Sequence, residues 1–128
     1  MWTWEERCEL IKYMYPIVDG CGGVPFDMRK VYPIKQREVK KIYEFLKTQE
    51  SVEQAYIFGS SVSMKCTQRS DTDIGIRLRP EFNYTEIRSY LRSHIHDYCP
   101  HDCDILWIND LKPSEKIYEN IMKGVQII

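Results

Sequence analysis

Ala55-Tyr56-Ile57-Phe58-Gly59-Ser60 is followed, after ten intervening residues, by Asp71-Thr72-Asp73-Ile74-Gly75-Ile76-Arg77-Leu78. The first stretch is a short apolar run that leads into a Gly-Ser pair, which is typical of a buried strand followed by a turn or brief helix. In the second stretch apolar residues occupy every other position from Ile74 to Leu78, as in a strand with one buried face. The two stretches therefore predict two strands with polar residues at one end of each.

The segments around these two strands alternate between helical and extended patterns. Residues 35–49 and 85–98 each carry an apolar stripe at helical spacing. Residues 103–108 are typical of a third strand, Pro113 suits the first turn of a last helix, and residues 125–128 are predicted to add a final strand. This order predicts an α/β (α+β) fold, a small mixed sheet with helices mainly on one face.

The N-terminal quarter of the chain is less regular. Thr3 and Glu6 have the spacing of a capping box at the start of a short helix, and the Gly-rich residues 19–25 are predicted to form a loop. We therefore expect residues 1–33 to be an appendage and residues 34–128 to form the main domain.

Composition narrows the class of protein. The chain has 128 residues, 43% of them hydrophobic and 29% charged, which is the balance of a globular domain. Its 18 basic and 19 acidic residues offer no general attraction for a polyanion, so no stably bound long nucleic acid is expected. No apolar run is long enough for a membrane helix. The cysteines are odd in number and include no CxxC pair, which predicts reduced thiols and a cytoplasmic protein: Cys8, Cys21, Cys66, Cys99 and Cys103.

Carboxylates begin the second strand and recur on the third. Asp71 and Asp73 are two residues apart, so in an extended chain both point to the same face and repel each other. A hard divalent cation with oxygen ligands, such as Mg²⁺, would relieve that repulsion. Asp104 is predicted to supply a third carboxylate from a neighbouring strand, and Asp102 on the same strand face is the alternative.

The Gly-Ser pair suits a phosphate. Gly59 lets the backbone approach a phosphate without a Cβ in the way, and Ser60 at a helix start offers an N–H and a hydroxyl. Three carboxylates around two metal ions about 3.5 to 4 Å apart are typical of phosphoryl or nucleotidyl transfer. The residues thus predict a metal-dependent transfer site with Asp71, Asp73 and Asp104 as catalytic and metal-binding groups.

This arrangement resembles the polymerase-beta-like nucleotidyltransferase superfamily, and most closely its minimal nucleotidyltransferases, whose signature is Gly-Ser, ten residues, then Asp-x-Asp. The resemblance extends from about Lys35 to the C-terminus and includes Cys103-Asp104-Ile105-Leu106 as the apolar-Asp-apolar third element. It implies the nucleotidyltransferase palm fold. It also implies metal ligation by Asp71, Asp73 and Asp104, and triphosphate binding by Gly59 and Ser60.

The chain departs from the family after the Gly-Ser pair. The family commonly continues with small and basic residues and a Gly, whereas residues 61–65 read Ser-Val-Ser-Met-Lys. The Arg often found there is absent, and Lys65 or Arg69 is the predicted substitute for contact with the triphosphate.

The resemblance further implies a reaction and a partner. The expected reaction transfers a nucleoside monophosphate, AMP from ATP, to an acceptor hydroxyl with two Mg²⁺ ions, with Asp104 assisting deprotonation of the acceptor. Minimal members of the family act beside a small helical protein of the higher eukaryote and prokaryote nucleotide-binding (HEPN) class, as the antitoxin of a toxin–antitoxin pair. The alternatives are a small-molecule adenylyltransferase of the aminoglycoside type and an idle binding protein.

A second cluster of metal-binding residue types lies near the third strand. It comprises His94, His96, Cys99, His101 and Cys103. The two histidines on the predicted helix are two residues apart and face different ways, and no further Cys or His pair follows at zinc-finger spacing. We therefore expect a polar helix end and loop here, not a zinc site.

Arg77 is a further candidate for the site. It follows the aspartate pair on the same strand face, where it could neutralise a phosphate or pair with a carboxylate.

Overall fold

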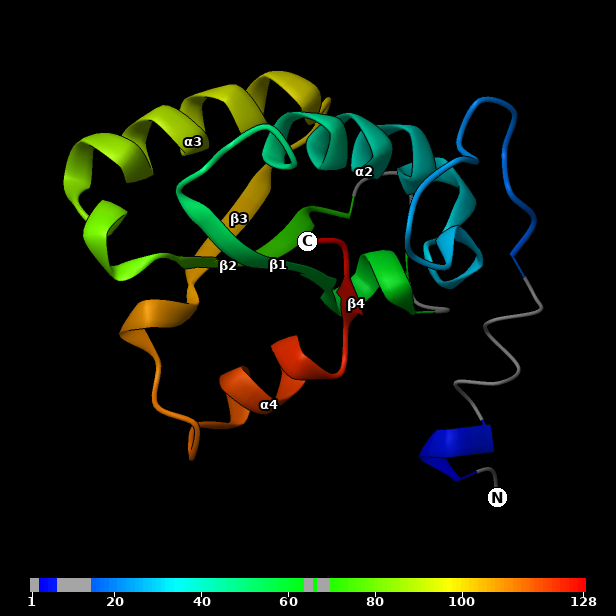
Figure 1. Ribbon diagram of the computed structural model, residues 1–128. Coiled ribbons are helices and arrows are strands. Elements are labelled where there is room, and N and C mark those ends of the chain that lie inside the picture. Colours follow the sequence, from blue (N-terminus) through cyan, green and yellow to red (C-terminus); the bar gives the residue numbers. More distant parts are fainter. Residues whose placement is uncertain (1–2, 7–14, 64–65, 67–69) are drawn as a thin grey trace.

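The computed structural model describes residues 3–6, 15–63, 66 and 70–128. Its helices and strands follow one another in the order shown in Figure 1. They are α2 (Pro33–Leu46), β1 (Val52–Phe58), β2 (Thr72–Leu78), α3 (Thr85–Tyr98), β3 (Cys103–Trp107), α4 (Lys116–Met122) and β4 (Val125–Gln126). A short 3₁₀ turn, Gly59–Val62, directly follows β1.

The strands form one mixed sheet in the order β3-β2-β1-β4. β1 is antiparallel to both β2 and β4, whereas β2 and β3 run parallel. Parallel neighbours need a crossover connection, and α3 provides it. As a result, the C-terminal end of β1 and the N-terminal ends of β2 and β3 meet at the same edge of the sheet.

Helices cover the two faces of the sheet unequally. Figure 1 shows α2 and α3 together on one face and the shorter α4 on the other. The main core lies under α2 and α3, where Ile42, Ile74, Ile76 and Leu91 are fully buried. A smaller cluster around Tyr56, Phe58, Ile108 and Ile121 packs under α4. The prediction of a mixed α/β sheet with helices mainly on one face is confirmed.

The boundaries of some elements differ from the sequence prediction. Helix α2 begins at Pro33, because proline at the first helical position needs no hydrogen-bond partner for its nitrogen. β1 begins at Val52 and not at Ala55, since its first residues pair with the end of β2 across a local irregularity. α4 begins at Lys116, three residues after Pro113. Tertiary pairing and turn formation, which leave little trace in sequence periodicity, set these limits.

Only part of the predicted N-terminal helix lies within the described residues. Helical conformation is present at residues 4–6. The Glu6 N–H donates to Thr3 Oγ1 at 3.1 Å, and the Thr3 N–H donates to Glu6 Oε2 at 3.3 Å. The predicted capping box is therefore present, while the rest of that helix lies outside the described residues.

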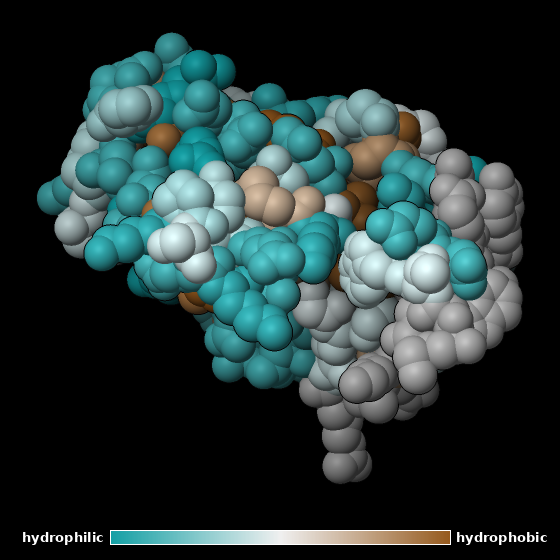
Figure 2. Space-filling view, turned by 90° about the horizontal axis from the view of Figure 1, so that it is seen from below, coloured by the Kyte–Doolittle hydropathy of each residue, from teal (hydrophilic) through white to brown (hydrophobic). Residues whose placement is uncertain are grey.

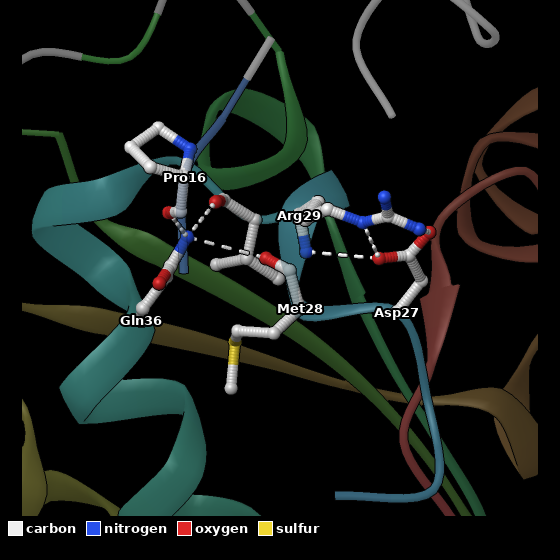
Figure 3. A network of polar contacts seen from close by, with 6 residues as sticks. Pro16, Asp27, Met28, Arg29 and Gln36 are labelled. Atoms are coloured by element: carbon white, nitrogen blue, oxygen red, sulfur yellow. Dashed lines mark hydrogen bonds and ion pairs between the residues drawn. The ribbon is translucent and has the colours of Figure 1, made fainter. Parts of the chain in front are cut away.

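Residues 15–32 are held against α2 by Gln36. Its side-chain amide is fully buried and makes four hydrogen bonds to backbone groups. Figure 3 shows this amide directed at the carbonyl groups of Pro16 and Met28. Met28 and Val31 also enter the main core. The division into residues 1–33 as an appendage and residues 34–128 as the main domain stays a prediction.

The surface on the α4 side is mostly polar. Figure 2, seen from that side, shows hydrophilic residues over most of the face and hydrophobic residues only in small separate spots. None of the helices in the described ranges is both long and apolar enough to cross a membrane. Within the same ranges Cys21, Cys66, Cys99 and Cys103 are buried.

Candidate active site

The predicted site residues meet at the edge of the sheet where β1 ends and β2 and β3 begin. Phe58 lies opposite Asp73 across the antiparallel pair, and Asp73 is aligned with Asp104 across the parallel pair. Aligned residues on neighbouring strands project to the same face of a sheet. The face is the one covered by α4, because Gly75, two residues after Asp73, lies against Ile121. The carboxylates of Asp73 and Asp104 are therefore neighbours.

Gly59 lies directly against the Asp73 carboxylate. Its φ angle of +73° falls in the left-handed region, which glycine adopts without strain. A Cβ at this position would be 2.3 Å from Asp73 Oδ2, well inside van der Waals contact. Two features thus require glycine at position 59: its backbone angle and the nearby Asp73 carboxylate, which leaves no room for a Cβ.

The acidic groups at this edge interact electrostatically. The pKa of the Asp73 carboxyl is raised from 3.8 to about 6, first by burial and then by the negative charges of Asp104 and Asp71. Lys35 acts in the opposite direction and lowers this pKa. Burial together with neighbouring like charges, the combination that raises this pKa, is expected where several acids share a partly enclosed space.

The three aspartates differ in exposure. Asp73 is half-buried, while Asp71 immediately before β2 and Asp104 on β3 are exposed. No three Asp, Glu, His or Cys side chains in the described ranges converge closely enough to form a preassembled metal site. Carboxylate oxygens nevertheless suit a hard divalent cation, and a cation between them would offset the repulsion that raises the Asp73 pKa. Binding would require the exposed carboxylates to turn toward the ion.

The Gly-Ser pair opens the 3₁₀ turn after β1. This turn is held by the Tyr32 N–H, which donates to Ser61 O at 2.8 Å, and by the Ser63 N–H, which donates to Ser60 O at 3.1 Å. The predicted brief helix after Gly59 is confirmed. Lys65 and Arg69, the predicted substitutes for the missing arginine, lie outside the described residues.

Asp102, the alternative third carboxylate, lies in a different environment. Its side chain is 68% exposed, faces His96 at 3.7 Å, and accepts the Cys103 N–H at 2.9 Å. Asp104, not Asp102, is aligned with Asp73 and affects its pKa. The geometry therefore favours Asp104 as the third acidic group.

Arg77 contacts neutral side chains in the described part of the chain, and its predicted role toward a phosphate stays a prediction. Its guanidinium donates to Gln54 Oε1 and to the Tyr118 hydroxyl, both at 3.0 Å. These partners belong to β1 and α4, and Arg77 itself lies four residues after Asp73 on β2. The histidines near β3 also have separate contacts: His94 stacks on Phe45 with ring centroids 4.9 Å apart, away from His96 and its contact with Asp102.

A buried lysine behind the site is not among the residues that the sequence patterns selected. Lys35 and Glu38 on α2 are 3% and 5% exposed, and Lys35 Nζ lies 3.5 Å from Glu38 Oε2. The sequence does contain a signal, because Lys35 is in helical phase with the apolar residues Val39, Ile42 and Leu46. A charged residue in the core phase of a helix predicts a buried polar contact.

Comparison with known proteins assigns the family. The model of the family described as "Polymerase beta, Nucleotidyltransferase" matches residues 40–128, which include the Gly-Ser turn and all three aspartates. The chain belongs to this nucleotidyltransferase family. The resemblance inferred from the Gly-Ser and Asp-x-Asp spacing is therefore confirmed.

A solved structure supports the fold of this nucleotidyltransferase family member. The structure is described as a crystal structure of the toxin–antitoxin MntA-HpeT, mutated at two aspartates. The match has a TM-score of 0.54 and 15% identity, and it covers 71% of this chain and 72% of the other. Identity this low shows the fold alone. No curated protein matched this chain.

Proposed function

We propose that this chain transfers AMP from ATP to a hydroxyl group of a partner protein, with Asp71, Asp73 and Asp104 as the ligands of two Mg²⁺ ions. The observation that supports this proposal is the alignment of Asp104 with Asp73 beside Gly59. Three acidic groups next to a turn that offers backbone N–H groups suit a metal-bound triphosphate.

The two ions would stabilise charge on the attacking and leaving oxygens of the displacement. Asp71 and Asp73 would bind the metal ions next to the triphosphate. Asp104 would orient the acceptor hydroxyl and take up its proton, directly or through water. The acceptor oxygen forms a bond to the α-phosphorus. The bond from this phosphorus to the bridging oxygen breaks, and pyrophosphate leaves with the electron pair.

Gly59 and Ser60 are proposed to bind the triphosphate. The backbone of the turn approaches the site closely because Gly59 has no side chain, and Ser60 adds an N–H and a hydroxyl. Lys65 and Arg69 belong to the connection between this turn and β2, and we propose that one of them supplies the positive charge that relatives obtain from an arginine.

A protein of the HEPN class is the proposed acceptor. The proposal rests on the likeness to minimal nucleotidyltransferases and on the fold shared with a chain of the MntA-HpeT toxin–antitoxin structure. Transfer of AMP to such a partner would add a negative charge and a bulky group to its surface, which is sufficient to block a catalytic or binding site.

The test is transfer of label from ATP that is radioactive at its α-phosphate. The full chain is incubated with Mg²⁺, this ATP and lysate of the source cell, and labelled proteins are identified by mass spectrometry. We expect one protein of the HEPN class to carry AMP, and the Asp71→Asn/Asp73→Asn variant to give no label. Equal labelling by this variant would exclude the metal-dependent mechanism.

The same assay separates the two alternatives. Label on a purified aminoglycoside, and not on protein, would identify a small-molecule adenylyltransferase. Absence of any transfer, together with tight binding of a HEPN-class protein, would identify an idle binding protein.

A further inference from the structure

Lys35 occupies a position that is costly for a lysine. It lies in the first turn of α2, at the positive end of the helix dipole, and its side chain is 3% exposed. Burial of an ammonium group is unfavourable unless specific partners compensate for the lost water. The partners of Lys35 therefore indicate what this residue does.

The first partner is Glu38, one turn along the same helix. Lys35 Nζ lies 3.5 Å from Glu38 Oε2, while Glu38 Oε1 is buried and has no hydrogen-bond partner in the described part of the chain. A buried ion pair with an unsatisfied oxygen contributes little to stability, because desolvation offsets the attraction between the charges. The ion pair by itself is therefore weak evidence for a purely stabilising role.

The second partner is the carbonyl oxygen of Ser70, to which the Lys35 ammonium donates a short hydrogen bond. Ser70 immediately precedes Asp71. On the other side of Asp71, the Thr72 N–H donates to Asp102 O at 3.1 Å. The backbone is thus anchored just before and just after Asp71, by α2 on one side and by the segment leading into β3 on the other.

We propose that Lys35 is a positioning residue for metal binding. Its contact with the Ser70 carbonyl fixes the backbone at the start of β2 and thereby orients the side chains of Asp71 and Asp73. This inference rests on the proposed function. Glu38 holds the ammonium in place and balances its charge. Lys35 itself touches neither nucleotide nor metal in this scheme.

A purely electrostatic role of Lys35 predicts a different change in metal affinity, which allows a clear test. If Lys35 acted only as a nearby positive charge, its removal would strengthen the binding of a divalent cation. Removal of Lys35 together with Glu38 leaves the net charge unchanged, so mainly the anchor on Ser70 is lost. For this double variant, electrostatics alone predicts unchanged metal affinity, whereas loss of the anchor on Ser70 predicts weaker binding.

The experiment measures Mn²⁺ binding to the full chain by electron paramagnetic resonance, without nucleotide. The test variant is Lys35→Met/Glu38→Leu. Its matched control is Lys40→Met, which removes another α2 lysine that donates to a backbone carbonyl, that of Gly20. We expect about tenfold weaker Mn²⁺ binding in the double variant, as for other groups that orient metal ligands. Lys40→Met should bind Mn²⁺ like the wild type.

A second measurement separates positioning from folding. Thermal unfolding should be little changed in the double variant, because an apolar pair of similar volume can replace a buried ion pair. In the transfer reaction, the Mg²⁺ concentration for half-maximal rate should rise about tenfold, and most of the maximal rate should return at saturating Mg²⁺.

Several results would overturn the inference. Unchanged or tighter Mn²⁺ binding in the folded double variant would exclude an anchoring role. If that variant does not fold, Lys35→Gln/Glu38→Gln replaces it, since glutamine is shorter than lysine and has no positive charge to hold the Ser70 carbonyl. Failure of both variants to fold would leave the pair a structural role only. A wild type that binds no Mn²⁺ would overturn the proposed function as well.

Discussion

The two faces of the sheet carry different sets of charged residues at the end where β1 stops and β2 and β3 begin. On the α4 side, Asp73 and Asp104 are neighbours of the same sign and lie near solvent. On the α2 side, Lys35 and Glu38 have opposite signs and are almost completely buried. The solvent side can leave like charges unpaired because a cation can arrive from solution, whereas a buried charge needs a partner from the chain itself.

The two faces also differ in the roles proposed for their residues. The solvent side carries the groups that would contact metal and nucleotide, and the buried side holds the backbone from which those groups project. Substitutions on the first side should change the rate of transfer most, and substitutions on the second should change stability or the geometry of metal binding.

The largest expected effect is on the solvent side. Asp104→Asn should lower the rate of AMP transfer at least about a hundredfold, because a metal ion contributes several kcal/mol of transition-state stabilisation. Asp102→Asn is the matched control, since Asp102 pairs with His96 and is not aligned with Asp73. Single-turnover transfer measures both variants. Similar rates for the two would remove the basis for choosing Asp104.

On the buried side, Gln36→Leu should lower the free energy of unfolding by about 2–4 kcal/mol, because it leaves buried backbone groups without partners. Those groups belong to residues 16–31 and are the four that Gln36 now satisfies. Urea unfolding gives the value. Gln49→Leu, which loses one hydrogen bond at the surface, should change stability by less than about 0.5 kcal/mol. Equal effects would mean that the N-terminal segment adds little to the fold.

Gly59→Ala tests the contact between turn and carboxylate. The variant should lose about 1–2 kcal/mol from its positive φ angle, and its Cβ should push the Asp73 side chain away. Gly23→Ala is the matched control, because Gly23 has a φ of +77° and a Cβ added there would meet no atom within 4 Å in the described part of the chain. The difference between the two variants isolates the contact with Asp73. Transfer rate should fall for Gly59→Ala alone.

The smallest expected effect is a pH dependence. The Asp73 pKa of about 6 lies above its ordinary value of 3.8, so the folded protein binds more protons between those values. Stability of the metal-free protein therefore falls as pH rises through this window. Asp73→Asn should be more stable than the wild type by about 1–2 kcal/mol at pH 7.5, less than the full shift implies because solvent screens a half-buried group.

The advantage of Asp73→Asn should become small near pH 4, where the wild-type carboxyl is protonated in the folded state and about half protonated in the unfolded state. Mg²⁺ should raise the melting temperature of the wild type at pH 7.5 and leave that of Asp73→Asn nearly unchanged. Thermal unfolding across this pH range checks both. A full advantage that persists at pH 4 would show that the buried negative charge of Asp73 is not its cause.

Local patterns in the sequence are sufficient for most of the fold. The helical stripe over residues 85–98 predicts α3 with its observed limits, and the period-two pattern of β2 is correct to within one residue. Both elements have strong periodicity and one clearly buried face. The apolar run that predicts β1 is three residues too short, because the start of this strand is defined by pairing with β2, which periodicity does not encode.

The candidate site follows from the sequence only in part. Asp71, Asp73 and Gly59 belong to one spaced motif, so local sequence is enough to select them. The choice between Asp102 and Asp104 needs the register of β3 against β2. Arg77 also suits the site by its strand face, but side chains of β1 and α4 hold its guanidinium elsewhere.

The sequence by itself determined the order of strands and helices, the Gly-Ser turn and the pair of aspartates, because each depends on residues close together in the chain. The tertiary structure alone decided that Asp104 lies beside Asp73, that Gln36 holds the N-terminal segment, and that Lys35 reaches Ser70. These contacts join residues far apart in sequence. Their formation depends on strand register and helix packing, which arise only when the whole chain folds.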